Sequence, residues 1–163
     1  MNKQTVSTFC AVSLLALATG CAEGPYATQL PDRVPVEQAG LEGSQWRLVE
    51  FQSMDDAQGV TRPVNPDDYT MQLMAGGRVA FKLDCNRGMG GWSSSPAGDG
   101  TSGSISFSQL AVTKAYCPPP SMGEMLERDT QYMRSYILRD GKLNISLMAD
   151  GGIYVWEPAV EEE

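Results

Sequence analysis

Four cysteines are the residues of this 163-residue chain best suited to covalent chemistry. Cys10 lies in an apolar run near the amino terminus, and Cys21 directly follows three small residues, 18–20. Cys85 and Cys117 stand far from these two and from each other. A thiol can accept lipid, form a disulfide or bind metal. The four positions therefore carry predictions about where the protein is located and what crosslinks it.

The chain contains no histidine. This removes the commonest general base, the commonest zinc ligand and every Ser-His or Cys-His dyad. A Ser-Lys pair such as Ser121 and Lys114 could act without histidine. Ser121, however, fits better as the cap of a helix, because Glu124 follows at the spacing of a capping box. We therefore expect a protein that is not an enzyme.

Metal ligands are also scarce. Met122 and Met125 could bind copper, but their helical spacing favours core packing. Two acidic pairs, Asp55-Asp56 and Asp67-Asp68, lack the alternating ligand spacing of a calcium loop and are typical of turns. We expect neither a metal nor a cofactor.

The amino terminus has the pattern of an export signal. Lys3 precedes an uncharged run, Val6 to Ala18, which suits a signal peptide and falls short of the ~20 residues that span a bilayer. Ala18-Thr19-Gly20-Cys21 resembles the bacterial lipoprotein signal, in which cleavage precedes a cysteine that receives diacylglycerol. Ala22 in place of Asp implies sorting to the outer membrane. An ordinary cleaved signal and a membrane-spanning anchor are the alternatives.

These features divide the chain into segments. Residues 1–20 are the predicted lipoprotein signal, 21–43 a lipidated, proline-containing flexible linker, 44–159 one folded domain and 160–163 an acidic tail. The signal contains one lysine and no acid, so the remainder has 11 basic and 20 acidic residues, a net charge of −9. This acidic balance argues against a nucleic-acid partner. We expect the protein to sit at the outer membrane through lipid on Cys21, facing the periplasm.

Alternating apolar residues dominate the folded part. Strands are expected at 46–51, where the alternation slips and predicts a bulge, and in the hairpin 69–83. The turn pair Asp140-Gly141 predicts a second hairpin. One helix is expected over about 121–134, and long loops over 52–68 and 86–103. The fold class is α+β: an antiparallel, strongly curved sheet, or partly open barrel, of about seven strands with one packed helix.

Cys85 and Cys117 are predicted to form a disulfide, because an exported chain folds in an oxidising compartment. They are 32 residues apart, and the alternating pattern of the preceding strand places Cys85 on the core side. Two free buried thiols are the alternative.

The stretch from Trp46 to about Trp156 resembles the META domain family, the HslJ-like heat-shock-linked lipoproteins. The resemblance is carried by the Trp46-x-Leu48 opening, by Cys85-Asn86 with glycines after it, by Thr113 and Cys117 before a helix, and by the closing hairpin. Asp84 stands where the family usually has glycine. The resemblance implies the fold, a Gram-negative envelope location and links to stress response. It implies no agreed activity, although some members resemble secretin pilotins in shape.

The glycine- and serine-rich segment 86–103 is the candidate recognition loop, with Asn86, Met89 and Trp92 as its contact residues. An apolar groove lined by Met71, Phe81 and Ile145 is expected beneath it. Trp92 folded back over the core is an equally weighted alternative.

The predicted function is a binding or envelope stress and maintenance module whose partner is an envelope protein or a small apolar ligand. A pilotin-like chaperone for a secretin and a lysozyme-inhibitor-type periplasmic inhibitor are the alternatives.

Overall fold

The computed structural model describes residues 40–159. The predicted signal peptide, the lipidation site Cys21, nearly all of the linker and the acidic tail lie outside the described residues. Ten strands of the described part form one antiparallel sheet. They are β1 (Gln45–Gln52), β2 (Val60–Thr61), β3 (Tyr69–Met74), β4 (Arg78–Leu83), β5 (Asn86–Ala97), β6 (Ser102–Phe107), β7 (Ala111–Val112), β8 (Met133–Arg139), β9 (Lys142–Leu147) and β10 (Ile153–Pro158).

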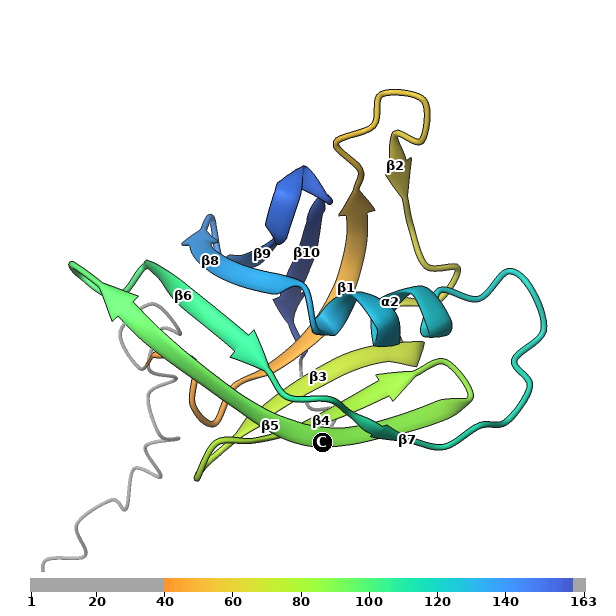
Figure 1. The fold of residues 1–163 in the computed structure, drawn as a ribbon, viewed down its shortest axis with the longest axis horizontal. Coiled ribbons are helices and arrows are strands. Elements are labelled where there is room, and N and C mark those ends of the chain that lie inside the picture. The colour runs from red at the N-terminus through yellow and green to blue at the C-terminus, as the bar shows by residue number, and fades with distance from the viewer. Residues whose placement is uncertain (1–39, 160–163) are drawn as a thin grey trace, which may run out of the picture. The chain divides into compact units, whose positions relative to one another are not determined.

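Eight of these strands form a closed ring. The order β10-β9-β8-β6-β5-β4-β3-β1 returns to its start because β1 also pairs with β10 (Figure 1). The short strands β2 and β7 attach to β1 and β5. The expected fold class, an antiparallel curved sheet with one helix, is confirmed. The ring has one strand more than expected and is closed rather than partly open, because β5 adds a strand where a loop was predicted.

Alternation of apolar residues places one face of each strand inside the ring. In the hairpin β3–β4, the side chains at odd-numbered strand positions are all buried: Tyr69, Met71, Leu73, Val79, Phe81 and Leu83. The two indoles of Trp46 and Trp156 are also in the core. The predicted bulge in β1 is confirmed by a register shift between Leu48 and Glu50. The Asp140-Gly141 turn has positive φ at both residues, as a type I′ turn requires.

Helix α2 (Gly123–Thr130) is shorter than predicted. The turn formed by Tyr132 N–H and Asp129 O ends it, and Met133 begins β8 instead of extending the apolar stripe of the helix. A buried methionine at position 133 fits both the apolar face of a helix and the alternation of a strand. The sequence pattern alone therefore could not locate the end of the helix. No helix within residues 40–159 is long and apolar enough to cross a bilayer.

Contacts to three strands hold α2 on the ring. The backbone N–H of Met122 donates to the hydroxyl of Tyr69 in β3, and a Cβ at Gly123 would lie 2.7 Å from the carbonyl oxygen of Leu83 in β4. At the other end of the helix, Tyr154 of β10 contacts Asp129. The helix therefore runs from the β3–β4 hairpin to β10.

The predicted loop 86–103 is wrong over most of its length. Residues 86–91 pair with β4 and residues 92–97 pair with β6, so this glycine-rich segment is the 12-residue strand β5. Its glycines allow close approach of other chain segments: a Cβ at Gly90 would lie 2.7 Å from Cδ2 of Leu110. Composition indicated a loop, but here glycine serves packing.

The expected core position of Cys85 is also wrong. Asp84 adopts a φ of 63°, and the turn at Asp84 and Cys85 breaks the alternation of β4. Cys85 is therefore exposed. The same positive φ explains why this position has aspartate, which tolerates left-handed backbone geometry better than most residues other than glycine.

Candidate functional site

The predicted disulfide is present between Cys85 and Cys117, with Cα atoms 5.6 Å apart. It joins the turn after β4 to the segment that leads into α2. Asn86, next to Cys85, reinforces this connection: its Oδ1 accepts from the N–H of Ala115 at 2.8 Å, and its Nδ2 donates to the carbonyl of Ala115 at 2.9 Å. Oδ1 also accepts from the hydroxyl of Thr113, and Nδ2 lies 3.3 Å from Sγ of Cys117. The side-chain amide of Asn86 therefore makes hydrogen bonds to residues 113–117 of the kind that the backbone of a neighbouring strand would make.

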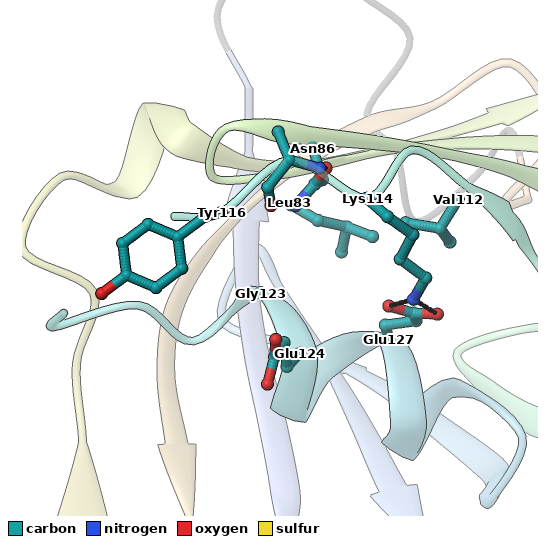
Figure 2. Close-up of a pocket in the computed structure, with 9 residues that line it drawn as sticks. Leu83, Asn86, Val112, Lys114, Tyr116, Gly123, Glu124 and Glu127 are labelled. Carbon is teal, nitrogen blue, oxygen red and sulfur yellow. Dashed lines mark hydrogen bonds and ion pairs between the residues drawn. The ribbon is translucent and has the colours of Figure 1, made fainter. Parts of the chain in front are cut away.

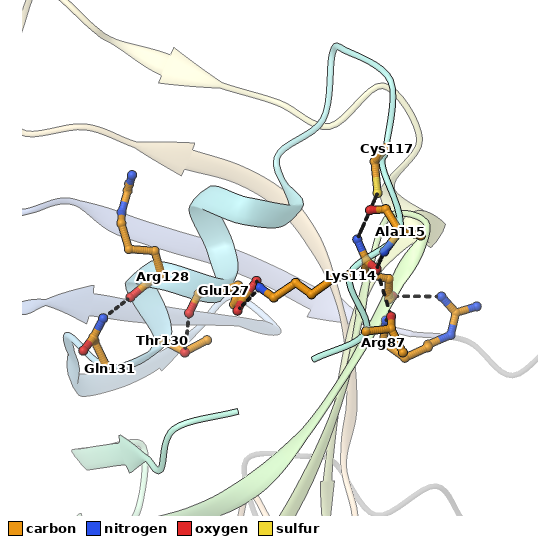
Figure 3. A network of polar contacts seen from close by, with 10 residues as sticks. Arg87, Lys114, Ala115, Cys117, Glu127, Arg128, Thr130 and Gln131 are labelled. Atoms are coloured by element: carbon orange, nitrogen blue, oxygen red, sulfur yellow. Dashed lines mark hydrogen bonds and ion pairs between the residues drawn. The ribbon is translucent and has the colours of Figure 1, made fainter. Parts of the chain in front are cut away.

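A small hollow lies between this segment and the first turn of α2 (Figure 2). Figure 2 shows the exposed ring of Tyr116 and the Lys114–Glu127 ion pair at opposite ends of it. Nζ of Lys114 contacts both carboxylate oxygens of Glu127, at 2.7 and 2.8 Å, within the polar network of Figure 3. The volume, about 190 Å³, is below the 300–1,000 Å³ typical of ligand pockets.

Ser121 and Lys114 do not form the pair considered from the sequence. The hydroxyl of Ser121 accepts from the N–H of Gly123 at 3.2 Å, whereas the Lys114 ammonium is held by Glu127. Within residues 40–159 no three His, Cys, Asp or Glu side chains are grouped closely enough to hold a metal ion.

The residues of the candidate recognition loop are placed on β5. The indole N–H of Trp92 donates to the carbonyl of Met74 at 3.1 Å, and the half-buried ring packs against the core. Met89 lies on the same strand and is 50% exposed. Met71, Phe81 and Ile145 are inside the core, each at most 2% exposed, so the expected groove beneath this segment is absent. A recognition role for Asn86, Met89 or Trp92 stays a prediction.

A larger groove, about 580 Å³, lies elsewhere on the ring and is called the α2 groove below. Three segments form it: the loop after β1, the helix α2 with its exit, and the β9–β10 connection. The residues that line it are Phe51, Ser53, Asp55, Gln58, Met125, Arg128, Asp129, Tyr132, Leu147, Met148, Ala149, Asp150 and Gly151.

Apolar side chains supply much of the α2 groove. Phe51 stacks on Tyr154 with ring centroids 4.6 Å apart, and Met125 and Leu147 pack against the core. Tyr132 and Met148 are 41% and 45% exposed, which is high for large apolar side chains. The backbone N–H of Met148 donates to the carbonyl of Tyr132 at 2.8 Å, which fixes the two segments together.

A buried carboxylate lies beside this apolar surface. Asp129 is 6% exposed; its Oδ1 accepts from Nε of Arg128 at 2.9 Å and its Oδ2 from the hydroxyl of Tyr154 at 2.8 Å. Burial, together with the Asp129 charge, raises the pKa of Tyr154, so its hydroxyl stays protonated and can donate. The hydrogen bond with Asp129 likewise raises the pKa of Arg128. Arg128 and Asp129 thus form an ion pair of no net charge.

Two further acids line the groove. The carboxylate of Asp55 accepts from the N–H of Ala57 at 2.9 Å and from Nε2 of Gln58 at 3.0 Å, and the first of these bonds is the main cause that lowers the pKa of Asp55. Asp150 adopts a φ of 55°, and the described hydrogen bonds and ion pairs of residues 40–159 give its carboxylate no partner.

Sequence reasoning missed this site because its parts come from three distant segments. Asp55 was interpreted as a turn former, which its hydrogen bonds bear out, but its place beside α2 depends on the closed ring. One signal was available: Asp129 interrupts the apolar stripe of the predicted helix. A charged residue on a buried stripe indicates a specific partner, here Tyr154.

Comparisons with known proteins give a family and a fold. The solved structure of a protein from Burkholderia xenovorans is similar with a TM-score of 0.58 at 19% identity, over 77% of this chain and 88% of that one. A DUF4847 family protein from Bacteroides vulgatus matches with a TM-score of 0.48 at 13% identity, over 75% of this chain and 96% of that one. No curated protein matches significantly. The META domain model matches residues 39–152, well over half of the chain, and the chain therefore belongs to the META domain family.

Proposed function

We propose that this META domain protein is a non-enzymatic binding module whose α2 groove takes an apolar ligand. The observation that carries the proposal is the groove itself. Its volume of about 580 Å³ is within the range of small-molecule sites, and its apolar surface is bordered by a few fixed polar groups. The ion pair between Arg128 and Asp129 fixes the orientation of these two side chains before a ligand binds.

We propose further that lipid on Cys21 anchors the module to the outer membrane, facing the periplasm. The amino-terminal sequence supports this: an uncharged run followed by small residues and a cysteine. Two or more acyl chains would be needed for stable anchoring, since one gives only marginal binding. Metabolic palmitate labelling tests it: Cys21→Ser should lose the label and accumulate an unprocessed precursor, whereas Cys10→Ser should keep the label. Unchanged labelling of Cys21→Ser would exclude the anchor.

Ligand binding by the groove is tested with a neutral apolar fluorophore, N-phenyl-1-naphthylamine, titrated into the purified protein. Met148→Glu places a charge in the groove and should weaken binding about tenfold or more, because the charge would lose hydration beside the ligand. Met89→Glu is the matched control, since Met89 has similar exposure, 50% against 45%, and lies on β5.

The control variant Met89→Glu also distinguishes between two candidate binding sites, the α2 groove and the surface of β5. Loss of binding only in Met89→Glu would move the site to the β5 surface around Trp92, where the sequence predicted recognition. Equal binding by both variants and the wild type would contradict a site in the groove.

A further inference from the structure

Negative charge is in excess among the side chains of the α2 groove. Asp55, Asp129 and Asp150 line it with one cation, Arg128. Nε of Arg128 donates to Oδ1 of Asp129 at 2.9 Å, so these two charges offset each other. Asp55 and Asp150 remain. Asp55 is ionised at neutral pH, and hydrogen bonds from Ala57 and Gln58 lower its pKa further below the ordinary value of 3.8.

Among residues 40–159, one other cation, Arg134, contacts a residue that lines the groove. Nη2 of Arg134 lies 3.5 Å from Sδ of Met148, but Nη1 of Arg134 donates to the carbonyl oxygens of Gln131 and Met133. Arg134 does not line the groove. These bonds hold the guanidinium at the backbone but leave its charge, so the groove together with Arg134 at its edge has a net charge of −1. Asp55 and Asp150 are the lining carboxylates for which the described contacts give no ion-pair partner.

The apolar part of the groove suits a cation as well as a hydrocarbon chain. The rings of Phe51 and Tyr132 line it together with the thioether of Met148. Aromatic faces attract ammonium groups, and carboxylates beside them add Coulomb attraction. The net charge of the chain, −8, draws cations toward the protein as a whole.

We infer that the ligand of the α2 groove is a small cationic amphiphile, a single molecule in which an apolar chain carries an amine or quaternary ammonium group. The chain would lie on Phe51, Met125 and Leu147, and the cationic group beside Asp150. Asp150 is the specificity residue, because its carboxylate has no partner within the described part of the chain. This inference rests on the proposed function of the groove.

Three probes with the same ten-carbon chain test it, each kept below its critical micelle concentration: decyltrimethylammonium, decyl sulfate and decyl maltoside. Isothermal titration calorimetry on the purified protein should give a dissociation constant for the cationic probe about tenfold or more below that of decyl sulfate. Salt should reduce this preference, because ions screen exposed carboxylates.

Asp150→Asn should reduce the preference for the cation by about threefold to fivefold, since one of two unpaired charges is removed. Asp140→Asn is the matched control: Asp140 also has a positive φ, 53° against 55°, and Asn tolerates this geometry, but Asp140 does not line the groove. It should leave the preference unchanged.

The outcomes separate the two proposals. Equal binding of all three probes would overturn the cation preference. The groove would still be the binding site if Met148→Glu also loses binding of N-phenyl-1-naphthylamine. Tighter binding of decyl sulfate would overturn the cation preference too and indicate that Arg128 is the anchor. Failure of all three probes to bind a protein that still binds N-phenyl-1-naphthylamine would overturn this inference alone. Failure of the fluorophore as well would overturn the proposed function and the inference with it.

Discussion

The hydroxyl of Tyr154 donates a 2.8 Å hydrogen bond to Oδ2 of Asp129 and so joins the last strand to the helix inside the protein. Both residues are buried, Tyr154 at 0% exposure. Burying a carboxylate is costly unless donors face its oxygens. Tyr154 supplies one donor and Arg128 the other. This arrangement lets α2 direct a charged residue toward the core next to the groove.

Removing this donor should destabilise the protein. Tyr154→Phe leaves Oδ2 of Asp129 without its buried partner, and we expect the free energy of unfolding to fall by about 1.5–3 kcal/mol, the range for hydrogen bonds to charged groups. Urea denaturation measures it. Tyr136→Phe is the control, because that buried hydroxyl donates to a neutral acceptor, the carbonyl of Gly100, at 3.2 Å. Its loss should be about 0.5–1.5 kcal/mol. Equal losses would contradict a special role for the charge of Asp129.

Asn86 should matter for stability more than an ordinary strand asparagine. Asn86→Ala removes both contacts with the backbone of Ala115 and the bond with Thr113. We expect a loss of about 2–3 kcal/mol in the free energy of unfolding, less than the sum of separate bonds because water replaces part of them. Asn144→Ala is the control, since the described contacts of Asn144 include one side-chain hydrogen bond, to Ile137 at 3.3 Å.

The disulfide refines this experiment. The covalent bond between Cys85 and Cys117 remains in Asn86→Ala, so residues 113–117 should loosen without leaving the ring. Faster amide hydrogen exchange at Ala115 would report the loosening. Unchanged exchange, with unchanged stability, would show that the disulfide alone holds the segment.

Local patterns were enough to predict much of the ring. The alternation in 69–83, the Asp140-Gly141 turn and the bulge after Leu48 each depend on neighbours within a few residues, and each was confirmed. The pairing of Cys85 with Cys117 followed from the expected oxidising compartment rather than from geometry. The side of the sheet on which Cys85 lies could not be predicted, because one positive φ at Asp84 reverses it.

Features that depend on tertiary contacts were missed. The glycines of 86–103 have the composition of a loop, but hydrogen bonding to β4 and then to β6 makes the segment a strand. Close packing of Leu110 on Gly90 is a contact between residues whose local patterns contain no sign of it. The α2 groove is likewise assembled from three segments, so only the closed ring brings Asp55 near Arg128.

Trp92 should behave mainly as a packing residue. Its ring is half-buried against the core and its indole N–H is bound to Met74. Trp92→Ala should lower the free energy of unfolding by about 2–4 kcal/mol, somewhat below the 3–5 kcal/mol of a fully buried tryptophan. Met89→Ala on the same strand is the control and should change it by less than about 0.5 kcal/mol, because the side chain is half exposed. Thermal denaturation of Trp92→Ala and Met89→Ala measures the difference between these two losses of stability. A small effect of Trp92→Ala, with loss of partner binding, would restore the predicted recognition role.

The stability contributed by Asp68 should depend on pH in a defined direction. The hydrogen bond from Nζ of Lys82, 2.8 Å from Oδ1, is the main cause that lowers the pKa of Asp68 below its ordinary value of 3.8. A group with a lowered pKa in the folded state stabilises the protein above its unfolded value and loses that contribution as pH falls through the folded value. Asp68→Asn should therefore be less stable than wild type at pH 6, by at most about 1 kcal/mol for a partly exposed pair, and the difference should disappear toward pH 2.

Melting temperatures measured from pH 6 to pH 2 test this directly. The gap between wild type and Asp68→Asn should begin to narrow as pH falls to the ordinary value of 3.8, and should close as the folded carboxyl, whose pKa is lower, takes up its proton. High salt should narrow the gap at pH 6, since ions screen the pair with Lys82. Asp56→Asn, at an exposed loop position, provides the baseline for removing one negative charge. A gap that widens on acidification would mean that protonated Asp68 is the stabilising form, and the contact with Lys82 would then not contribute as an ion pair.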